Sequence, residues 1–466
     1  MSALIKQIFG GILMKLVYGV KDKPKFGQVI VFAIQQLLAI LAATIAVPAI
    51  VGNGMSQSAA LFGAGVGTLV YLLFTKFRSP VFLGSSFAFL GSMAAAFAGG
   101  VSASAGYLGM IIGAVMAGLV YVIIALIVKF AGVKWISKLM PAVVIGPTVA
   151  IIGLSLSGNA IRDAVGGAKV AGGAYVMDAH AGVCLACAVV TLAVTMLCSV
   201  FGKKMLKMIP FIIGIVSGYI AATVFTLIGN AAGIDALKVI DFSAFANLQW
   251  VPKFTFITAF SGGYDFGDAG SIASYIGTIA AAYVPVAFVV FAEHIADHKN
   301  ISSIIESDLL EDPGLHRTLL GDGVGSMVGA FFGGCPNTTY GESIGCVAIS
   351  GNASVVTILA TAVLAIIASF FAPFVAFLAT IPSCVMGGVC IALYGFIAVS
   401  GLKMLQNVDL GENRNLFIVS VILIAGVGGL VLKFGSVTIT EVACALILGI
   451  LTNLILPEKK KKEETK

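Results

Sequence analysis

Charge is scarce in this sequence. Only 10% of its 466 residues are Asp, Glu, Lys or Arg, and His and Trp are rarer still, with four and two copies. Soluble domains carry about 25% charged residues, because their exterior must face water. A chain of this length with so little charge cannot cover itself with polar side chains. The composition therefore excludes an ordinary water-soluble protein.

Other absences narrow the class further. Cys184 and Cys187 have C-x-x-C spacing, but no second pair or His cluster accompanies them, so the eight cysteines predict buried thiols and neither a metal site nor a disulfide framework. Residues 1–26 carry five lysines and contain no A-x-A-like site after a short apolar stretch, so we expect no cleaved signal peptide. The apolar segments offer no nucleophile–base–orienter set, which argues against an enzyme.

Long apolar stretches fill most of the chain instead. Hydrophobic residues make up 59% of the sequence, and the mean hydropathy is +1.08. A membrane-spanning helix needs about 20 mostly apolar residues. We therefore predict an all-α polytopic membrane protein with about fourteen spans. The predicted spans are 27–50, 57–75, 80–98, 106–130, 140–158, 180–200, 207–230, 275–296, 318–334, 337–350, 353–375, 382–400, 414–432 and 437–456.

The positive charges support this set of spans. If the N-terminus is cytoplasmic, 22 of the 27 Lys and Arg fall on the cytoplasmic side and five on the other, as the positive-inside rule demands. Both termini are then expected in the cytoplasm and the long segment 231–273 outside. Seven spans precede that segment and seven follow it. An odd number per half places the halves in opposite orientations, which is the inverted-repeat plan of many secondary transporters.

Small and polar residues interrupt two of the spans. The third contains Gly84-Ser85-Ser86-Phe87 and the tenth contains Asn337-Thr338-Thr339-Tyr340, so each has a small polar doublet before an aromatic residue. Interrupted helices at corresponding positions of two halves indicate a binding site at the middle of the membrane. The alternative is ordinary packing of small residues between helices. We favour the binding site because both halves show the pattern at the same ordinal span.

Two acidic residues stand inside apolar segments. Glu293 ends the run from Tyr283 to Ala292, and Glu342 lies in the interrupted tenth span, whereas most other acidic residues fall in loops or tails. An ionised carboxylate at the centre of a spanning helix costs roughly 2.5–3.5 kcal/mol. That cost persists where the group lines a polar cavity or takes up a proton. The alternative for Glu293 is an interfacial position at a cytoplasmic helix end.

Two inward carboxylates suggest a neutral ligand. Carboxylates accept hydrogen bonds from N–H groups, and backbone N–H groups at half-helix ends donate to carbonyl oxygens. A heterocycle with alternating N–H and C=O groups satisfies both, whereas two glutamates repel an anion. Phe87, Tyr340 and Tyr394 are candidate stacking faces. Asp297 shares a helical face with Glu293; it could relay a proton, or it could simply begin the charged loop that follows.

At these residues the chain resembles the nucleobase–ascorbate transporter (nucleobase:cation symporter-2) family, and within it the bacterial uracil permeases. The resemblance runs from about residue 27 to residue 456. Asn-Thr-Thr-Tyr-Gly-Glu is its most specific element. The matching stretches are Gln35-Gln36, Ala43-Thr44 to Pro48, Gly84 to Phe89, Ala292-Glu-His294, Asp308 to Arg317, Pro336 to Glu342 and Leu393-Tyr-Gly395.

The resemblance implies a fold and a site. It implies two inverted seven-span repeats, with short strands in spans three and ten, and a usual homodimer. The domains would be a cytoplasmic tail (1–26), a core domain (27–138 and 274–380), a gate domain (139–230 and 381–456), an extracellular segment (231–273) and a Lys-rich cytoplasmic tail (457–466). The base would be bound by Glu293 and Glu342, by main-chain N–H groups of Phe87 and Gly341, and by Tyr340, Tyr394, Ala43 and Ser86, with Glu293, Asp297 and His294 coupling protons.

Two positions depart from the uracil permease pattern. The residue four after the first Glu is commonly His, but here it is Asp297, as in purine-transporting members, and the Gln-His of the first span is Gln35-Gln36.

We expect a proton-coupled uracil importer of the plasma (bacterial inner) membrane, with no cofactor and no nucleic-acid partner. A xanthine or uric acid carrier on the same scaffold is the nearest alternative. An anion carrier of related fold is more distant, because a carboxylate stands at Glu342. A channel is also more distant, since the sequence has no ring of charge or filter-like repeat.

Overall fold

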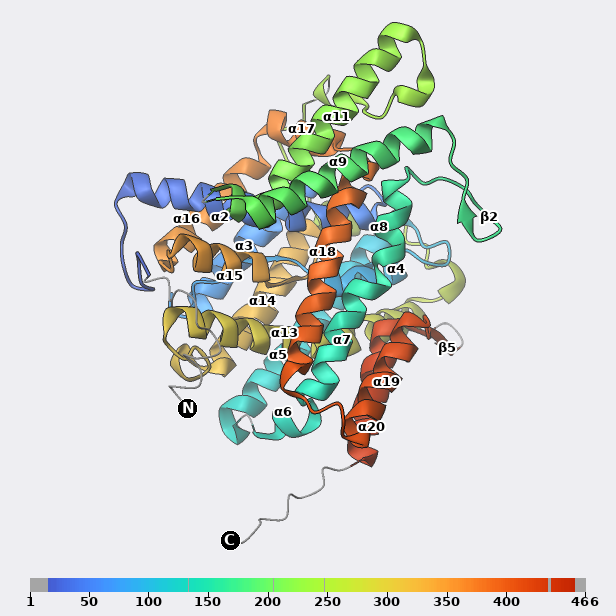
Figure 1. Ribbon diagram of the computed structural model, residues 1–466. Coiled ribbons are helices and arrows are strands. Elements are labelled where there is room, and N and C mark those ends of the chain that lie inside the picture. The colour runs from blue at the N-terminus through green and yellow to red at the C-terminus, as the bar shows by residue number, and fades with distance from the viewer. Residues whose placement is uncertain (1–15, 133, 204, 247, 435–436, 457–466) are drawn as a thin grey trace.

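The computed structural model describes residues 16–132, 134–203, 205–246, 248–434 and 437–456, and helices dominate it (Figure 1). Residues 1–15 and 457–466, which hold much of the two predicted tails, lie outside the described residues. The helices of the first half are α2 (Phe26–Val51), α3 (Gln57–Phe74), α4 (Leu90–Ala96), α5 (Ala103–Ala131), α6 (Lys134–Leu139), α7 (Ala142–Ser155), α8 (Ser157–Ala164), α9 (Ala179–Phe201), α10 (Met205–Met208) and α11 (Pro210–Ala232). Those of the second half are α12 (Thr255–Ala259), α13 (Ile272–Ile305), α14 (Leu315–Gly333), α15 (Gly341–Ser350), α16 (Val355–Ser369), α17 (Ala372–Thr380), α18 (Ser383–Lys403), α19 (Asn413–Val427) and α20 (Glu441–Ile455).

Polar caps mark where several long helices begin. Ser56, Ser102 and Ser271 precede α3, α5 and α13, and each side chain accepts a hydrogen bond from a backbone N–H in the first turn. Asp178 does the same before α9, at 2.8 Å from the N–H of Ala181. These bonds satisfy N–H groups that the helix itself leaves unpaired, so short polar signals between apolar stretches set the helix starts.

Each of the fourteen predicted segments coincides with a helix, or with a strand followed by a helix. In the described part of the chain, eight helices are long and apolar enough to cross a membrane. Two segments differ from expectation. The eighth was predicted to end at 296, but α13 continues to Ile305 because His298 and Ile301 are fully buried. The eleventh is broken into α16 and α17, which meet at an angle of 81°.

The helices pack in two groups. In one, α14 packs against α3 and α5, α16 against α2 and α3, and α13 against α5. In the other, α18 packs against α7, α8 and α9, α11 against α9, and α19 against α20 and α7; α18 and α7 run side by side at the front of Figure 1. Contact within the first group is very close, since a Cβ at Gly63 of α3 would lie 2.5 Å from the carbonyl oxygen of Gly329 in α14. Small residues permit such an approach between helices in lipid.

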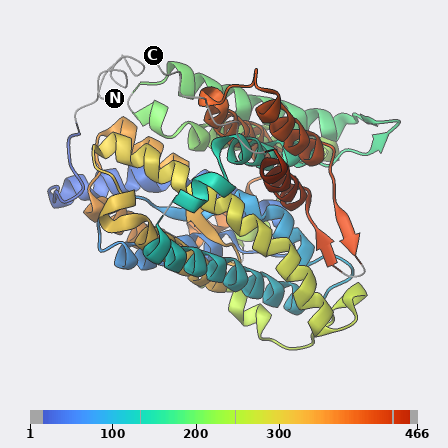
Figure 2. The ribbon, with the colours of Figure 1, turned by 90° about the horizontal axis from the view of Figure 1, so that it is seen from below.

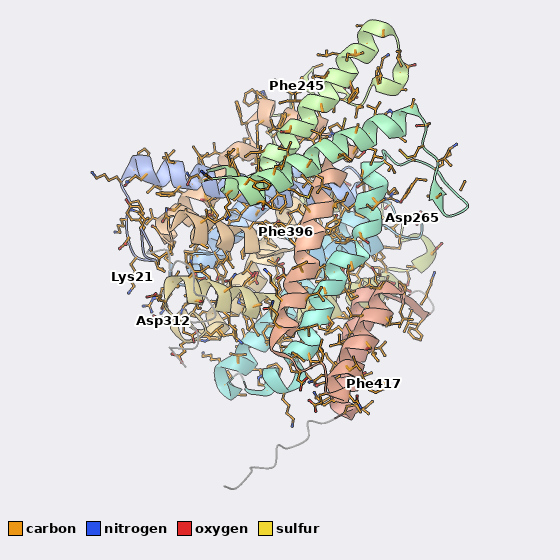
Figure 3. The ribbon with its side chains drawn as sticks, in the orientation of Figure 1. Lys21, Phe245, Asp265, Asp312, Phe396 and Phe417 are labelled. Carbon is orange, nitrogen blue, oxygen red and sulfur yellow. The ribbon has the colours of Figure 1, made fainter. Side chains whose placement is uncertain are left out.

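The outer faces of the second group are apolar. Phe396 on α18 and Phe417 on α19 point away from the body of the molecule (Figure 3), with 55% and 60% of their surface exposed. Ile424 on α19 is 74% exposed. Large apolar side chains arrayed along helices in this way suit contact with acyl chains.

Three short antiparallel ribbons complete the fold. β1 (Leu83–Ser85) pairs with β4 (Asn337–Thr339) in the interior. β2 (Val170–Ala171) and β3 (Ala174–Tyr175) form an exposed hairpin, and β5 (Leu432–Phe434) and β6 (Val437–Ile439) form another that leads into α20 (Figure 2). The two strands predicted within spans three and ten are thus present and are paired with each other.

Candidate functional site

The site is built on the β1–β4 ribbon. Leu83, Gly84 and Ser85 face Thr339, Thr338 and Asn337 in the pairing register. The ribbon continues by one bond at each end, from the N–H of Ser86 to the Pro336 carbonyl at 2.9 Å and from the N–H of Tyr340 to the Phe82 carbonyl at 3.2 Å. Since nearly all of these residues are buried, the pairing satisfies backbone groups that have no water to bond.

Each strand leads directly into a helix whose N-terminus lies inside the molecule. After β1 a 3₁₀ turn (Phe87–Phe89) continues into α4, and after β4 the helix α15 begins at Gly341. The capping residues Ser86 and Tyr340 make no side-chain cap bond. Backbone N–H groups in the first turn of a helix have no partner within it and carry the positive end of the helix dipole. Phe87 and Gly341 therefore present N–H donors from opposite directions.

The two helices begin at Phe87 and Gly341, the residues whose main-chain N–H groups the family resemblance names as donors. The pattern matched Phe87 with Tyr340, as the aromatic residue after each polar doublet. In the structure Phe87 begins the helix after β1, and its counterpart is Gly341, because Tyr340 is the capping residue. The two motifs are offset by one residue.

Three carboxylates gather beside the ribbon. Glu293 and Asp297 stand one turn apart on α13, and Glu342 lies in the first turn of α15. They are close enough for their charges to interact. All three are partly exposed, although the helices around them are mostly buried. Open space adjoins Gly341, which is exposed, since a Cβ added there would meet no heavy atom within 4 Å.

Asp297 is tied to the ribbon. The hydroxyl of Thr339 in β4 donates a 2.7 Å hydrogen bond to Oδ2 of Asp297. His298, the next residue, is fully buried, and its Nε2 lies 2.7 Å from the hydroxyl of Tyr71 on α3. The alternative that this stretch simply begins a solvated loop is therefore wrong, because α13 continues through it into the packed interior.

Aromatic side chains border the ribbon on both sides. The ring of Tyr340 lies across β1, where its hydroxyl donates to the Ser85 carbonyl at 2.8 Å. Gly84 leaves the space for this ring, since a Cβ there would be 2.3 Å from it. Tyr394 on α18 meets Phe87 edge to face, with 5.7 Å between ring centroids. Its buried hydroxyl lies beside the Cys390 thiol, a weak hydrogen-bonding group.

The remaining predicted residues are closely packed. Ala43, near the middle of α2, is 1% exposed, and Ser86 is 2% exposed with no partner for its hydroxyl among the described residues. Helix α2 is attached to α15 through Gln36, whose side-chain amide donates to the Ser343 carbonyl at 3.1 Å. This bond holds the first span against the helix that carries Glu342.

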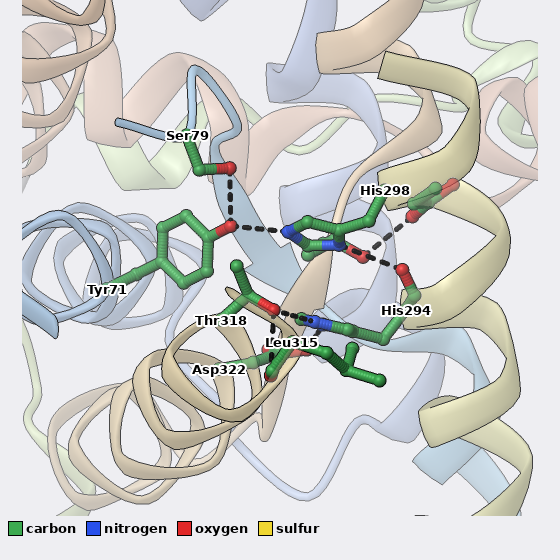
Figure 4. A network of polar contacts seen from close by, with 9 residues as sticks. Tyr71, Ser79, His294, His298, Leu315, Thr318 and Asp322 are labelled. Atoms are coloured by element: carbon green, nitrogen blue, oxygen red, sulfur yellow. Dashed lines mark hydrogen bonds and ion pairs between the residues drawn. The ribbon is translucent and has the colours of Figure 1, made fainter. Parts of the chain in front are cut away.

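His294 lies in the interface between α13 and α14, where it meets Asp322 and Thr318 (Figure 4). Its Nδ1 lies 2.7 Å from Oδ2 of Asp322, and its Nε2 lies 3.0 Å from the Thr318 hydroxyl. Its carbonyl accepts a bond from Nδ1 of His298, which extends the network to Tyr71 and Ser79. Both histidines are fully buried, so the network fixes α13 against α3 and α14.

Asp322 is the residue that sequence reasoning missed. It is 1% exposed in the middle of α14, although the acidic residues outside Glu293 and Glu342 were assigned mostly to loops and tails. The sequence did contain a sign of its role, because Asp322 is a lone acid within a predicted span, and such a group is costly without a partner. Only the fold shows that His294 is that partner.

No metal centre is indicated near these groups. In the described ranges, no three His, Cys, Asp or Glu side chains are grouped as metal ligands. Asp297 instead accepts a hydrogen bond from the Thr339 hydroxyl.

A family model described as the permease family matches residues 27–433. The chain belongs to this family, the nucleobase–ascorbate transporters. Among curated permeases of the family, the uracil permease of Bacillus caldolyticus is 42% identical over 454 residues, covering 97% of each chain. The uracil permease of Escherichia coli (strain K12) is 34% identical, covering 94% of this permease and 93% of its own length. These relatives are permeases, and this chain is a multi-pass transporter and not an enzyme.

Solved structures share the permease fold at low identity. The transmembrane domain of the cyanobacterial bicarbonate transporter BicA has a TM-score of 0.62 at 16% identity and covers 94% of this chain and 99% of its own. SLC26A9 has a TM-score of 0.65 at 12% identity, with 93% of this chain and 66% of its own covered. At such identities the likeness extends to the architecture of a transporter membrane domain.

Proposed function

We propose that this permease is a proton-coupled symporter that imports uracil. The observation that carries the proposal is that the β1–β4 ribbon leads into two helices, which begin at Phe87 and Gly341, while the partly exposed Glu342 in the first turn of the second is close enough to Glu293 for their charges to interact. The uracil permeases to which the chain is 34–42% identical support the choice of substrate.

The chemistry of the site suits a uracil ring. Uracil alternates two C=O with two N–H groups around a flat, neutral ring. The free N–H groups of Phe87 and Gly341 donate to its carbonyl oxygens, and Glu293 and Glu342 accept from its N–H groups. The Tyr394 hydroxyl and the Phe87 ring offer a further polar contact and an apolar wall.

Proton coupling follows from the crowding of acids. Glu293 interacts with the charges of Asp297, Glu342 and Asp322, and like charges held together away from water cannot all stay ionised. A proton taken up at Glu293 lowers this repulsion and prepares the site for a neutral base. Asp297, whose carboxylate accepts a hydrogen bond from Thr339, affects how readily Glu293 takes up this proton. His294 acts indirectly by fixing α13 against α14.

The proposal includes the whole architecture. Fourteen spans would form two inverted repeats, with a core domain (27–138 and 274–380) moving against a gate domain (139–230 and 381–456) to expose the site alternately. The two packing groups of helices support this division, and the ribbon lies in the core group. Both termini would be cytoplasmic in a homodimer of the plasma membrane, with 231–273 outside.

Uptake into proteoliposomes tests the function. Radiolabelled uracil should accumulate when the outside is acidic and should not when the pH gradient is collapsed. Glu342→Gln removes a charged acceptor worth about 1.5–3 kcal/mol, so kcat/KM should fall at least tenfold. Glu293→Gln removes the group that takes up the proton, so uptake should no longer respond to the pH gradient. Glu306→Gln is the matched control, because Glu306 is an exposed acid at the end of the same α13. Normal uptake by both site variants would exclude this site.

A purine carrier is the second candidate, because Asp297 stands where uracil permeases commonly have His. Competition separates the two, since unlabelled xanthine or uric acid should leave labelled uracil uptake unchanged in a uracil carrier. An anion carrier is disfavoured by the three clustered carboxylates, which repel a negative substrate.

A further inference from the structure

A cavity lined in part by Phe87 adjoins the candidate site. Its volume is about 260 Å³, near the lower end of the roughly 300–1,000 Å³ typical of pockets for drug-sized ligands. One wall comes from the segment after β1, with Phe87, Gly91 and Ser92. Neither Glu293 nor Glu342 lines it, so this cavity is distinct from the site described above.

The opposite wall is polar and comes from the second packing group. Asn159 and Arg162 on α8, with Ser155 before them, face the cavity together with Thr440 and Glu441 at the start of α20. Lys and Arg counting places this end of the molecule outside the cell, so the cavity faces the incoming substrate.

The two charged side chains and the Thr440 hydroxyl of this wall are available to bind a ligand. Among the described residues, neither Arg162 nor Glu441 takes part in an ion pair. Thr440 precedes α20 without capping it, and its hydroxyl, in a residue 8% exposed, has no partner in the described part of the chain. One positive and one negative group across a small cavity favour a neutral, dipolar ligand over an ion of either sign.

The Phe87–Tyr394 contact is the boundary between cavity and site. Phe87 lines the cavity and begins the helix that offers its N–H to the site, and its ring meets Tyr394 of α18 edge to face. Phe87 and Tyr394 belong to different packing groups. Relative movement of the two groups would separate these rings and join the two spaces.

We propose that this outer cavity is an entry site, where a neutral nucleobase is held by Asn159, Arg162 and Thr440 before the Phe87–Tyr394 contact opens. The proposal rests on the proposed function and adds a binding site that the same substrate occupies before it reaches the inner site. The amide of Asn159 offers one donor and one acceptor group, and the guanidinium of Arg162 donates to carbonyl oxygens.

Substitutions on the outer wall test the entry site. Asn159→Leu and Arg162→Gln should each lower kcat/KM for uracil uptake about three- to tenfold, the range for one lost hydrogen bond. The Kd for uracil of the purified protein should stay within twofold of the unaltered value, because the inner site is intact. Lys169→Gln is the matched control, since it removes one external positive charge next to the exposed β2 and is not part of the cavity wall.

The results of these measurements distinguish an entry site from an effect on the inner site and from a general effect of charge. Unchanged kcat/KM in both variants overturns the entry site, as does an equal loss in Lys169→Gln, which would reveal a general effect of charge. A parallel weakening of Kd also overturns it, because the variants would then act on the inner site. If the unaltered protein takes up no uracil, the proposed function fails before any of these comparisons.

Discussion

Replacing Gly84 with Ala tests how tightly the ribbon positions the site. Gly84 faces Thr338 in the middle of the ribbon, and an added Cβ would lie 2.3 Å from Cε2 and Cζ of Tyr340. The ring cannot move aside freely, because its hydroxyl is bonded to the Ser85 carbonyl at 2.8 Å. The methyl group must displace the ring or separate the strands.

The expected loss follows from these two contacts. Overpacking a tight site costs about 1–3 kcal/mol, and breaking a buried hydrogen bond costs about 0.5–1.5 kcal/mol. Together they should lower the free energy of unfolding by roughly 1.5–4.5 kcal/mol. Because Tyr340 immediately precedes Gly341 and Glu342, the KM for uracil should also rise several-fold.

Thermal unfolding in detergent, measured beside uptake kinetics, checks this expectation. Gly182→Ala is the control, since a Cβ added there in α9 meets no heavy atom within 4 Å and Ala is the better helix former by up to about 1 kcal/mol. Tyr340→Leu removes the clashing ring, so the double variant with Gly84→Ala should be more stable than the sum of the single effects predicts. Equal melting of Gly84→Ala and Gly182→Ala, or strict additivity in the double variant, would refute the reasoning.

Two further substitutions probe buried hydroxyl groups with opposite expectations. Tyr394→Phe removes a buried hydroxyl whose neighbour is the weakly hydrogen-bonding Cys390 thiol, so the melting temperature of the ligand-free protein should change little while the KM for uracil rises; a lower melting temperature with normal KM would contradict this. Tyr71→Phe leaves Nε2 of the buried His298 without its partner, which should cost about 1–3 kcal/mol in thermal unfolding. Tyr264→Phe is its control, since that residue is 42% exposed. Equal losses of stability in the two variants would show that the buried network stabilises the fold no more than an exposed hydroxyl does.

The helices were predictable because their causes are local. Runs of apolar residues and polar caps such as Ser102 and Asp178 depend only on neighbouring positions. The acids at Glu293 and Glu342 could be recognised because each interrupts an apolar stretch. The two strands were expected only from the family resemblance, since three-residue strands leave almost no periodic signal.

What the sequence did not reveal depends on contacts between distant segments. Asp322 lies among glycines in α14, and nothing nearby in sequence indicates that it faces His294 on another helix. The polar-doublet pattern aligned Tyr340 with Phe87, although only Phe87 begins a helical turn. The Tyr340 ring packs over Gly84, and the helix after Tyr340 begins at Gly341.

The β1–β4 ribbon also imposes an order on biosynthesis. β1 belongs to the first half of the chain and its partner β4 to the second, so the ribosome releases β1 long before β4 exists. Until then, the N–H and C=O groups of β1 must be satisfied inside the membrane by something other than their final partner. The half of the proposed site that is made first therefore remains incomplete until the second half is made, and a chain truncated before Asn337 would insert helices without forming the ribbon on which that site is built.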